Sequence, residues 1–459
     1  MTDYRRIADR IAADITAGRL RPGERLPPQR QFARRYGIAA STAERAYGEL
    51  VRRGLVVGEV GRGTFVRAAP DDPAGRGLTE EAPAPVNLEL NYPSAEGQSE
   101  LLTPALSALL RPDVLAESLR PAAATGTPAA REAAADLLAT PGWRPRPERI
   151  LFTGNARQAV AAALASLVRP GGRLGVEQLT YPVVKDIAAR LGITLVALAT
   201  DEEGLRPDAV AAAHRAAPLA ALYVQPTLHN PTSATTSRER RRQLARTVEY
   251  LDIPVVEDRI WSFLADTDDP LASYAPGLTH VVDGLSKRVA PGLTVGFLVV
   301  PPRRVGTVAD AVRSGGWSAG RFALEAGVRW MTDGTVDRLV AAKRADAGRR
   351  QRILAAGLRG FAVRSDPRAY YAWWELPAPW RADTFTAAAA AYGIAVTPGP
   401  AFAVDPSRTP DAVRLGLASA PLADLERALG TLADVAARGA GHSNGRSDGR
   451  SDGQSNRPS

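Results

Sequence analysis

Short apolar runs alternate with alanine-rich helical patterns between residues 150 and 300, and few folds accommodate that order. The apolar runs have the length and the β-branched content of buried strands. Parallel strands need a crossover connection, which helical stretches between them supply. The expected strands are Ile150–Thr153, Leu174–Val176, Thr194–Leu198, Ala220–Val224, Val255–Asp258, Val281–Gly284 and Val295–Val300.

These seven strands, with expected helices at Ala156–Val168, Pro182–Leu191 and Arg238–Leu251, predict an α/β domain with a mostly parallel seven-stranded sheet. From about residue 335 the order changes to a long arginine-rich helix and then to three short strand patterns around a second helix. That order predicts a smaller α+β domain. The three patterns are Ala369–Leu376, Ile394–Val396 and Ala412–Leu417.

The first 68 residues form a separate, basic segment. They carry 14 arginines against 7 acidic residues, a net charge of +7 in a chain whose net charge is +9. An isoleucine repeat predicts a first helix, Gln29–Tyr36 a second, and Ser41 with Glu44 a capping box that opens a third. The expected buried face of the third helix comprises Ala43, Ala46, Tyr47, Leu50 and Val51, and its expected outer face Thr42, Arg45, Glu49 and Arg52.

Two β-branched stretches around a glycine-rich turn follow the third helix and predict a β-hairpin. Two helices joined by a tight turn, with a basic hairpin after them, make the plan of a winged helix-turn-helix. The charge of this segment points to nucleic acid as its partner. We therefore expect residues 1–68 to bind double-stranded DNA.

Three polar residues stand at or just after the ends of different expected strands: Asn230, Asp258 and Lys287. Lys287 is expected in an exposed loop between two strands, where desolvation can lower its pKa and free its lone pair. An amide for a phenolic oxygen, a carboxylate for a protonated pyridine nitrogen and an imine-forming lysine together suit pyridoxal phosphate. Taken singly, the three also fit a turn, a helix cap and a solvated charge.

Several other classes of protein are excluded or disfavoured. The chain has no cysteine, which excludes disulfides and thiolate chemistry, and its four histidines are scattered, so no metal site is expected. The charged N-terminus and the lack of a long apolar run give no sign of a leader or a membrane span. We expect a cytoplasmic protein.

The N-terminal segment resembles the GntR family of regulators. The matching residues are Leu26, Pro27, Arg30, Gly37, Ser41, Thr42, Ala46, Tyr47, Leu50, Gly54, Leu55 and the run 61–66. The resemblance implies that Arg30, Ser41, Thr42 and Arg45 contact DNA. It also implies that the hairpin, with Arg62 and Gly63, approaches the minor groove.

The rest of the chain resembles fold-type I, class I aminotransferases, through HNPTS, VVEDRIW, GLSKR and the later GIAVTPGPAF and VRLGLA. A GntR head on such a body resembles the MocR regulators. The resemblance implies Lys287 as the Schiff-base lysine and Arg414 as the residue that binds an effector carboxylate. It implies as the cofactor-binding set Asn155, Ala156, Tyr181, Asn230, Asp258, Trp261, Ser286, Lys287 and Thr294.

Four positions depart from the family pattern. Thr294 stands where the family has a phosphate-binding arginine, Asn155 and Ala156 replace a Gly-Ser pair, and Trp261 replaces a tyrosine. A charge-assisted hydrogen bond contributes roughly 1.5–3 kcal/mol, so the missing arginine alone would weaken cofactor binding about tenfold or more. The departures favour a sensor over an enzyme.

The expected organisation is a DNA-binding domain at 1–68, a linker at 69–86, an effector-binding and dimerising body at 87–436 and a disordered tail at 437–459. The leading hypothesis is a homodimeric, head-to-tail transcriptional regulator that binds an operator, pyridoxal 5'-phosphate and a small amino-acid-like effector. Two alternatives stay open: a working pyridoxal-phosphate-dependent aminotransferase, and a sensor that binds its ligand without the cofactor.

Overall fold

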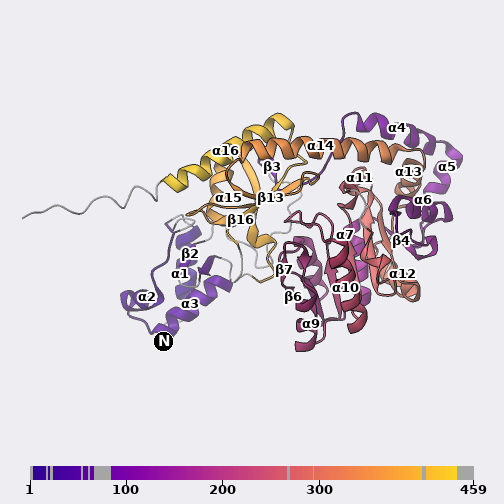
Figure 1. Cartoon of the computed structure of the whole chain (residues 1–459). Coiled ribbons are helices and arrows are strands. Elements are labelled where there is room, and N and C mark those ends of the chain that lie inside the picture. The colour runs from indigo at the N-terminus through magenta and orange to yellow at the C-terminus, as the bar shows by residue number, and fades with distance from the viewer. Residues whose placement is uncertain are drawn as a thin grey trace, which may run out of the picture.

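The computed structural model describes residues 4–16, 19–20, 24–52, 55–59, 63–66, 84–265, 269–292, 294–405 and 410–441. Figure 1 shows an N-terminal head, a large domain around one sheet and a smaller domain around another. The long helix α14 (Thr335–Gly357) runs along both domains. Within the described ranges, the helices are all too short or too polar to cross a membrane.

The head has the predicted winged-helix plan, in which an antiparallel hairpin follows the third helix. Its core is small and closed by Tyr47, whose hydroxyl donates to the carbonyl of Pro27 at 2.7 Å. Gly37 ends the second helix with φ of 60°, a left-handed conformation that glycine adopts without strain. The elements are α1 (Tyr4–Thr16), α2 (Gln29–Tyr36), α3 (Ala40–Arg52), β1 (Val56–Glu59) and β2 (Gly63–Val66).

The third helix differs from its prediction in three respects. It begins at Ala40, so Ser41 lies inside the first turn and is not the residue that caps it. Val51, predicted in the core, is 46% exposed, whereas Glu49, predicted outside, is buried. A helix advances about 100° per residue, so position 51 has turned about 80° away from the direction of Ala43.

The large domain has the predicted seven-stranded sheet. Strand β12 is antiparallel to both of its neighbours, and the other pairs are parallel. Parallel strands end at one edge, so residues that follow them gather there. In spatial order the strands are β4 (Ile150–Thr153), β12 (Gly296–Val299), β11 (Thr279–Gly284), β10 (Val255–Asp258), β9 (Ala221–Val224), β5 (Arg173–Glu177) and β6 (Thr194–Leu198).

Helices cover both faces of this sheet. Alternate strand residues point to opposite faces, so Val282 packs with one helical layer and Val281 with the other. One layer is α7 (Ala156–Leu167), α8 (Pro182–Arg190) and α12 (Val305–Ser314). The other is α4 (Gln98–Leu109), α6 (Pro128–Leu138), α9 (Pro207–Ala216), α10 (Arg238–Leu251) and α13 (Arg321–Thr332).

The small domain is built on a five-stranded sheet, and two of its strands were not predicted. Strand β13 (Ala362–Ser365) is mostly exposed and has little apolar content. Strand β3 (Val86–Leu88) pairs in parallel with β15, which places residue 86 of the predicted linker in the sheet. The order is β13, β14 (Tyr371–Glu375), β16 (Ala412–Gly416), β15 (Ile394–Pro398) and β3.

Two further helices, α15 (Ala382–Ala391) and α16 (Leu422–Gly441), pack on this sheet. Helix α16 runs five residues past position 436, where the sequence placed the end of the body. Residues 69–83 of the predicted linker and 442–459 of the predicted tail lie outside the described residues.

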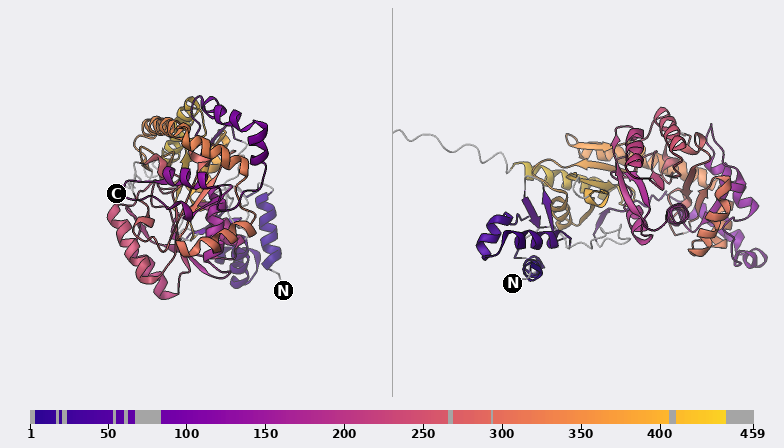
Figure 2. Two further views of the ribbon diagram at one scale, coloured as in Figure 1. Left: turned by 90° about the vertical axis from the view of Figure 1, so that its right-hand side faces the viewer. Right: turned by 90° about the horizontal axis from the view of Figure 1, so that it is seen from below.

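Seen from below (Figure 2, right), the head lies beside the small domain. The two are in direct contact where the guanidinium carbon of Arg381, at the start of α15, lies 4.4 Å from the ring centroid of Phe65 in β2. The remaining short elements are α5 (Pro112–Ser118), α11 (Leu285–Arg288), β7 (Thr200–Asp201), β8 (Gly204–Leu205), and the 3-10 turns η1 (Pro147–Arg149), η2 (Ser262–Leu264), η3 (Leu271–Ser273), η4 (Pro302–Arg304) and η5 (Gly399–Ala401).

Candidate functional site

Lys287 lies at the carboxyl edge of the large sheet, in the helical turn α11 that directly follows β11. The predicted exposed loop is therefore wrong, because this segment is a partly buried turn. The Nζ atom donates to the carbonyl of Asn91 at 2.6 Å. It also lies 4.5 Å from the ring centroid of Tyr92 and 5.2 Å from that of Trp261. Aromatic faces and one carbonyl thus hold the amine in place.

Burial lowers the pKa of Lys287 from 10.5 to about 7, and the positive charges of Arg157, Arg414 and Lys343 act in the same direction. Water that would solvate an ammonium is excluded, so the neutral amine is favoured. A neutral amine is the form that attacks a carbonyl carbon. Lys287 is therefore poised as a nucleophile near neutral pH.

Asp258 lies at the end of β10 and is buried. Its Oδ2 accepts hydrogen bonds from the Tyr223 hydroxyl at 2.7 Å and from Gln225 Nε2 at 2.9 Å. Its Oδ1 accepts from the backbone of Ile260 at 3.0 Å, which leaves lone-pair capacity for a further donor. Burial raises the pKa of Asp258, so a cationic donor beside it would be strongly favoured.

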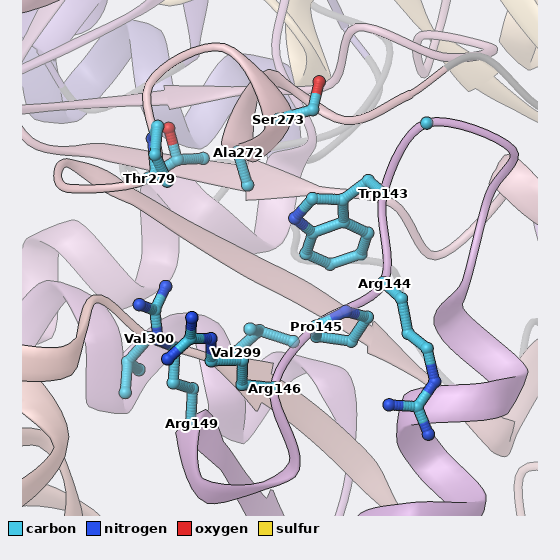
Figure 3. Close-up of a pocket in the computed structure, with 12 residues that line it drawn as sticks. Trp143, Arg144, Pro145, Arg146, Arg149, Ala272, Ser273, Thr279, Val299 and Val300 are labelled. Atoms are coloured by element: carbon cyan, nitrogen blue, oxygen red, sulfur yellow. The ribbon is translucent and has the colours of Figure 1, made fainter.

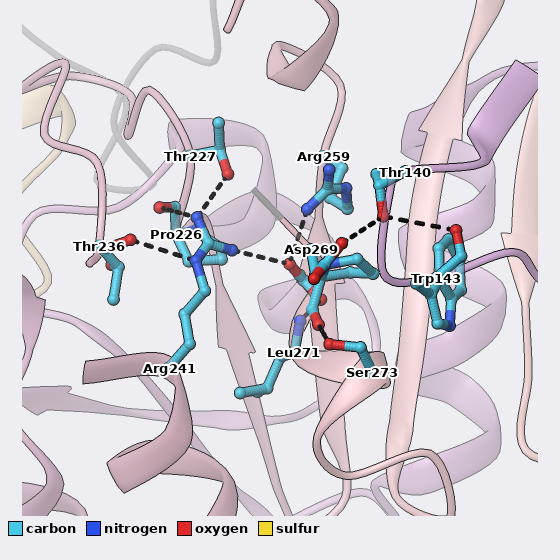
Figure 4. A network of polar contacts seen from close by, with 12 residues as sticks. Thr140, Trp143, Pro226, Thr227, Thr236, Arg241, Arg259, Asp269, Leu271 and Ser273 are labelled. Carbon is cyan, nitrogen blue, oxygen red and sulfur yellow. Dashed lines mark hydrogen bonds and ion pairs between the residues drawn. The ribbon is translucent and has the colours of Figure 1, made fainter. Parts of the chain in front are cut away.

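Asn230 sits in the loop after β9, and a network around Arg241 fixes that loop (Figure 4). Arg241 is almost wholly buried in α10 and donates to the carbonyls of Pro226 at 2.9 Å and Thr236 at 3.1 Å. Its Nη1 pairs with Glu257 at 3.5 Å. The network ties both ends of the loop to the sheet and so positions Asn230.

Arg414 comes from β16 in the small domain and is 2% exposed. Its Nη2 donates to the Thr397 hydroxyl at 3.0 Å and to the carbonyl of Glu89. Burial lowers the pKa of Arg414 from 12.5 to about 10, which leaves it charged at neutral pH. It is thus a buried cation on the small-domain side of the site.

A cavity of about 170 Å³ joins these residues. Its lining includes every body residue that the sequence singled out, although those residues come from both domains. They are Asn155, Ala156, Tyr181, Asn230, Asp258, Trp261, Ser286, Lys287, Thr294 and Arg414.

Four buried polar atoms of residues that line the cavity lack a hydrogen-bond partner in the described part of the chain. They are Asn91 Nδ2, Asn230 Oδ1, Thr294 Oγ1 and Arg414 Nε. Buried polar groups in folded proteins are almost always paired. Donors and acceptors that converge unpaired on one cavity indicate a site for a polar ligand with both kinds of group.

Sequence reasoning missed several residues of this lining, chiefly Arg157, Tyr92 and Gln225. Arg157 directly follows the two positions, Asn155 and Ala156, that were considered as a phosphate-binding turn. Gln225 directly follows the predicted strand Ala220–Val224, so its position was a usable signal. Tyr92 belongs to a segment before the large domain and carried no local signal.

In the head, Arg30 of α2 and Ser41 and Arg45 of α3 are exposed, and Thr42 is partly so. These four predicted DNA-contacting residues therefore lie on or near the surface. Arg62 lies outside the described residues. Gly63 begins β2 with φ of 123°, and a Cβ there would lie 2.6 Å from Arg25 Nε, so Arg25 is a further basic residue beside the hairpin.

Two family models match the chain. The model for "Aminotransferase class I and II" matches residues 85–432, about three quarters of the chain. The model for "Bacterial regulatory proteins, gntR family" matches residues 3–66. The two matches together cover the head and both domains of the body.

Similar proteins include regulators of transcription. The uncharacterized HTH-type transcriptional regulator YdeF of Bacillus subtilis is 28% identical over 429 residues, which are 93% of this chain and 92% of that protein. The HTH-type pyridoxine biosynthesis transcriptional regulator PdxR of Corynebacterium glutamicum is 28% identical over 306 residues, covering 64% of this chain and 65% of that protein.

Similar solved structures are aminotransferases. An archaeal alanine:glyoxylate aminotransferase superposes with a TM-score of 0.71 at 20% identity, covering 77% of this chain and 91% of that one. The α-aminoadipate aminotransferase LysN of Thermus thermophilus, complexed with N-(5'-phosphopyridoxyl)-L-leucine, gives 0.70 at 20% identity, covering 78% and 93%. At this identity the likeness establishes the fold of the body.

Proposed function

The chain belongs to the aminotransferase class I and II family and carries a gntR-type head, and from this premise we propose that it is a DNA-binding transcriptional regulator of the MocR type. The head binds an operator. The body holds pyridoxal 5'-phosphate and senses a small amino compound. The observation that carries the proposal is one cavity in which Asn230, Asp258 and Lys287 meet Arg414 of the other domain, in a chain with a winged-helix head.

The residues present fit the cofactor. The unpartnered Oδ1 of Asn230 can accept a hydrogen bond from a phenolic hydroxyl, and Asp258 has lone-pair capacity left for a protonated pyridine nitrogen. The unpartnered hydroxyl of Thr294 and the hydroxyl of Ser286 suit phosphate oxygens. When bound, pyridoxal phosphate supplies an aldehyde with which primary amines condense reversibly.

Each of this chain's residues has a distinct part in sensing. Lys287, whose pKa of about 7 makes its neutral form accessible near neutral pH, would supply the amine that holds the cofactor's aldehyde. Arg414 orients the carboxylate of the incoming compound, because the planar guanidinium matches a carboxylate. Trp261, buried beside Lys287, closes one wall and excludes water.

The same ligand touches both domains, and this makes it able to change their relative position. Lys287 belongs to the large domain and Arg414 to the small one. A ligand that contacts both favours the arrangement in which both contacts are made. The Arg381–Phe65 contact then supports transmission from the small domain to the DNA-reading hairpin.

We also propose that the regulator works as a homodimer, with each head reaching the partner's large domain. One recognition helix reads few base pairs, so a specific operator calls for two heads on half-sites spaced by multiples of roughly 10.5 base pairs. Analytical ultracentrifugation with and without an operator fragment tests this, and a monomer on a single half-site would contradict it.

The experiment for the proposed function has three readouts on one purified protein. Operator binding should be lost when residues 1–68 are deleted. Visible absorbance and a borohydride-stable link at Lys287 should appear with pyridoxal 5'-phosphate and not in Lys287→Ala. An amino acid donor should give no steady formation of keto acid. Turnover of roughly one per second or faster would favour the aminotransferase, and absence of the link would favour the cofactor-free sensor.

A further inference from the structure

Thr294 stands where the family has a phosphate-binding arginine, so the cavity has no cation at that position. A phosphate monoester carries a charge of about −1.5 to −2 at neutral pH, and burying it unpaired is strongly unfavourable. Thr294 offers one hydroxyl, which has no partner in the described part of the chain. A hydroxyl and a helix N-terminus alone would leave most of that charge uncompensated.

Arg157 supplies a guanidinium to the cavity at the N-terminus of α7. It lies in the first turn of α7, two residues after Asn155, whose side chain caps the helix by accepting from the backbone of Gln158 at 3.0 Å. The side chain of Arg157 hydrogen-bonds to the hydroxyls of Tyr181 and Tyr92, which also line the cavity. Two tyrosines therefore hold the guanidinium at the end of the helix whose dipole favours anions.

Two further cations, Arg414 of β16 and Lys343 of α14, do not lie at this helix N-terminus. Arg414 is fixed by Thr397 and the carbonyl of Glu89 on the small-domain side. Lys343 donates to the carbonyls of Lys287 at 3.0 Å and Val289 at 2.7 Å and does not itself line the cavity. Among the cations that line the cavity in the described part of the chain, Arg157 is the one at the N-terminus of α7.

We propose that Arg157 is the phosphate-binding cation of this cavity and that it selects a ligand bearing a phosphate monoester. In this chain the positive charge lies in the first turn of α7 and not at position 294, just before β12. This inference rests on the proposed function for the identity of the ligand. It extends that function by naming the residue that would bind the phosphate of the ligand.

Selectivity for the phosphate tests the assignment. The probes are pyridoxal 5'-phosphate and pyridoxal, which share the aldehyde and differ in the phosphate. Arg157→Gln should lower the preference for the phosphorylated probe about tenfold or more, because one charge-assisted bond is lost. Any effect of Arg157 on the reactivity of Lys287 acts on both probes and cancels in the ratio. Arg157→Lys should keep part of the preference.

Arg149→Gln is the matched control. Arg149 is a partly buried arginine that lines a different cavity of about 210 Å³, near Trp143 at the other end of the sheet (Figure 3). Its replacement should leave the preference unchanged. In the double variant Arg157→Gln/Thr294→Arg, the preference should return, because the two positions serve one phosphate. An unchanged preference in Arg157→Gln, or an equal loss in Arg149→Gln, would overturn the assignment.

A second probe separates this inference from the proposed function. If the wild type forms no link with pyridoxal phosphate, that part of the proposed function fails. Thermal unfolding with inorganic phosphate then tests Arg157 directly. Stabilisation of the wild type and not of Arg157→Gln supports the anion site, whereas equal responses of the two proteins refute it.

Discussion

Raising the pH from about 6 to about 9 should convert Lys287 from a mostly protonated to an almost fully neutral amine, with a midpoint of about 7. The causes are burial first, and then the charges of Arg157, Arg414 and Lys343. At pH 8, an amine of pKa 7 is about 90% neutral, whereas one of pKa 10.5 is about 0.3% neutral. The neutral fraction at Lys287 should thus exceed that of an ordinary lysine about 300-fold.

A labelling assay can follow each lysine separately, because lysine occurs only at positions 185, 287 and 343. The protein is mixed with pyridoxal 5'-phosphate at a series of pH values, quenched early with borohydride, and the label on each lysine is quantified by mass spectrometry. Lys287 lines the cavity proposed to hold the cofactor and Lys185 and Lys343 do not, so Lys287 should carry the early label. A rate at Lys287 that still rises steeply above pH 9, or equal labelling of Lys185, would refute the reasoning.

Three further changes have expected outcomes. Burial raises the pKa of Glu177 from 4.5 to about 7, so between these pH values the folded state binds a proton that the unfolded state does not. The free energy of unfolding therefore falls as the pH rises from 4.5 to about 7. Glu177→Gln should flatten this fall in urea unfolding curves measured from about pH 4 to about pH 8. Arg45→Ala should weaken operator binding and lower the slope of log affinity against log salt by about one if Arg45 contacts a phosphate, whereas it should relax specificity at one base pair if Arg45 reads a base. Arg381→Gln should leave DNA affinity without ligand nearly unchanged but reduce the ligand's effect on it, and an unaltered ligand effect would argue against the Phe65 contact as the link.

Much of the body could be predicted from sequence because its strands are buried on both faces. A continuous apolar run such as Ala220–Val224 predicts a buried strand, and the structure places β9 there. The convergence of Asn230, Asp258 and Lys287 followed from a general rule, since parallel strands deliver the residues after them to one edge. Arg414 needed the family resemblance, because no local pattern connects it to the large domain.

The rest depended on tertiary context. Lys287 looked like part of an exposed loop because small polar residues precede it, yet α14 and the segment around Tyr92 cover that turn. Helix α3 begins at Ala40, before the predicted cap Ser41, because alanine is at least as favourable as serine inside a helix. Arg157 was overlooked because arginine at a helix start usually faces solvent, and only the packing of Tyr92 and Tyr181 shows otherwise.

The central claim is that chemistry at Lys287 controls DNA binding without turnover. Its most direct test is operator affinity, measured by fluorescence anisotropy with pyridoxal 5'-phosphate present, as amino acids are added one by one to the wild type and to Lys287→Ala. At least one amino compound should shift the wild-type affinity severalfold, leave Lys287→Ala unaffected, and yield no more than one equivalent of keto acid per site. The same shift in both proteins, or steady keto acid formation alongside it, would contradict the account.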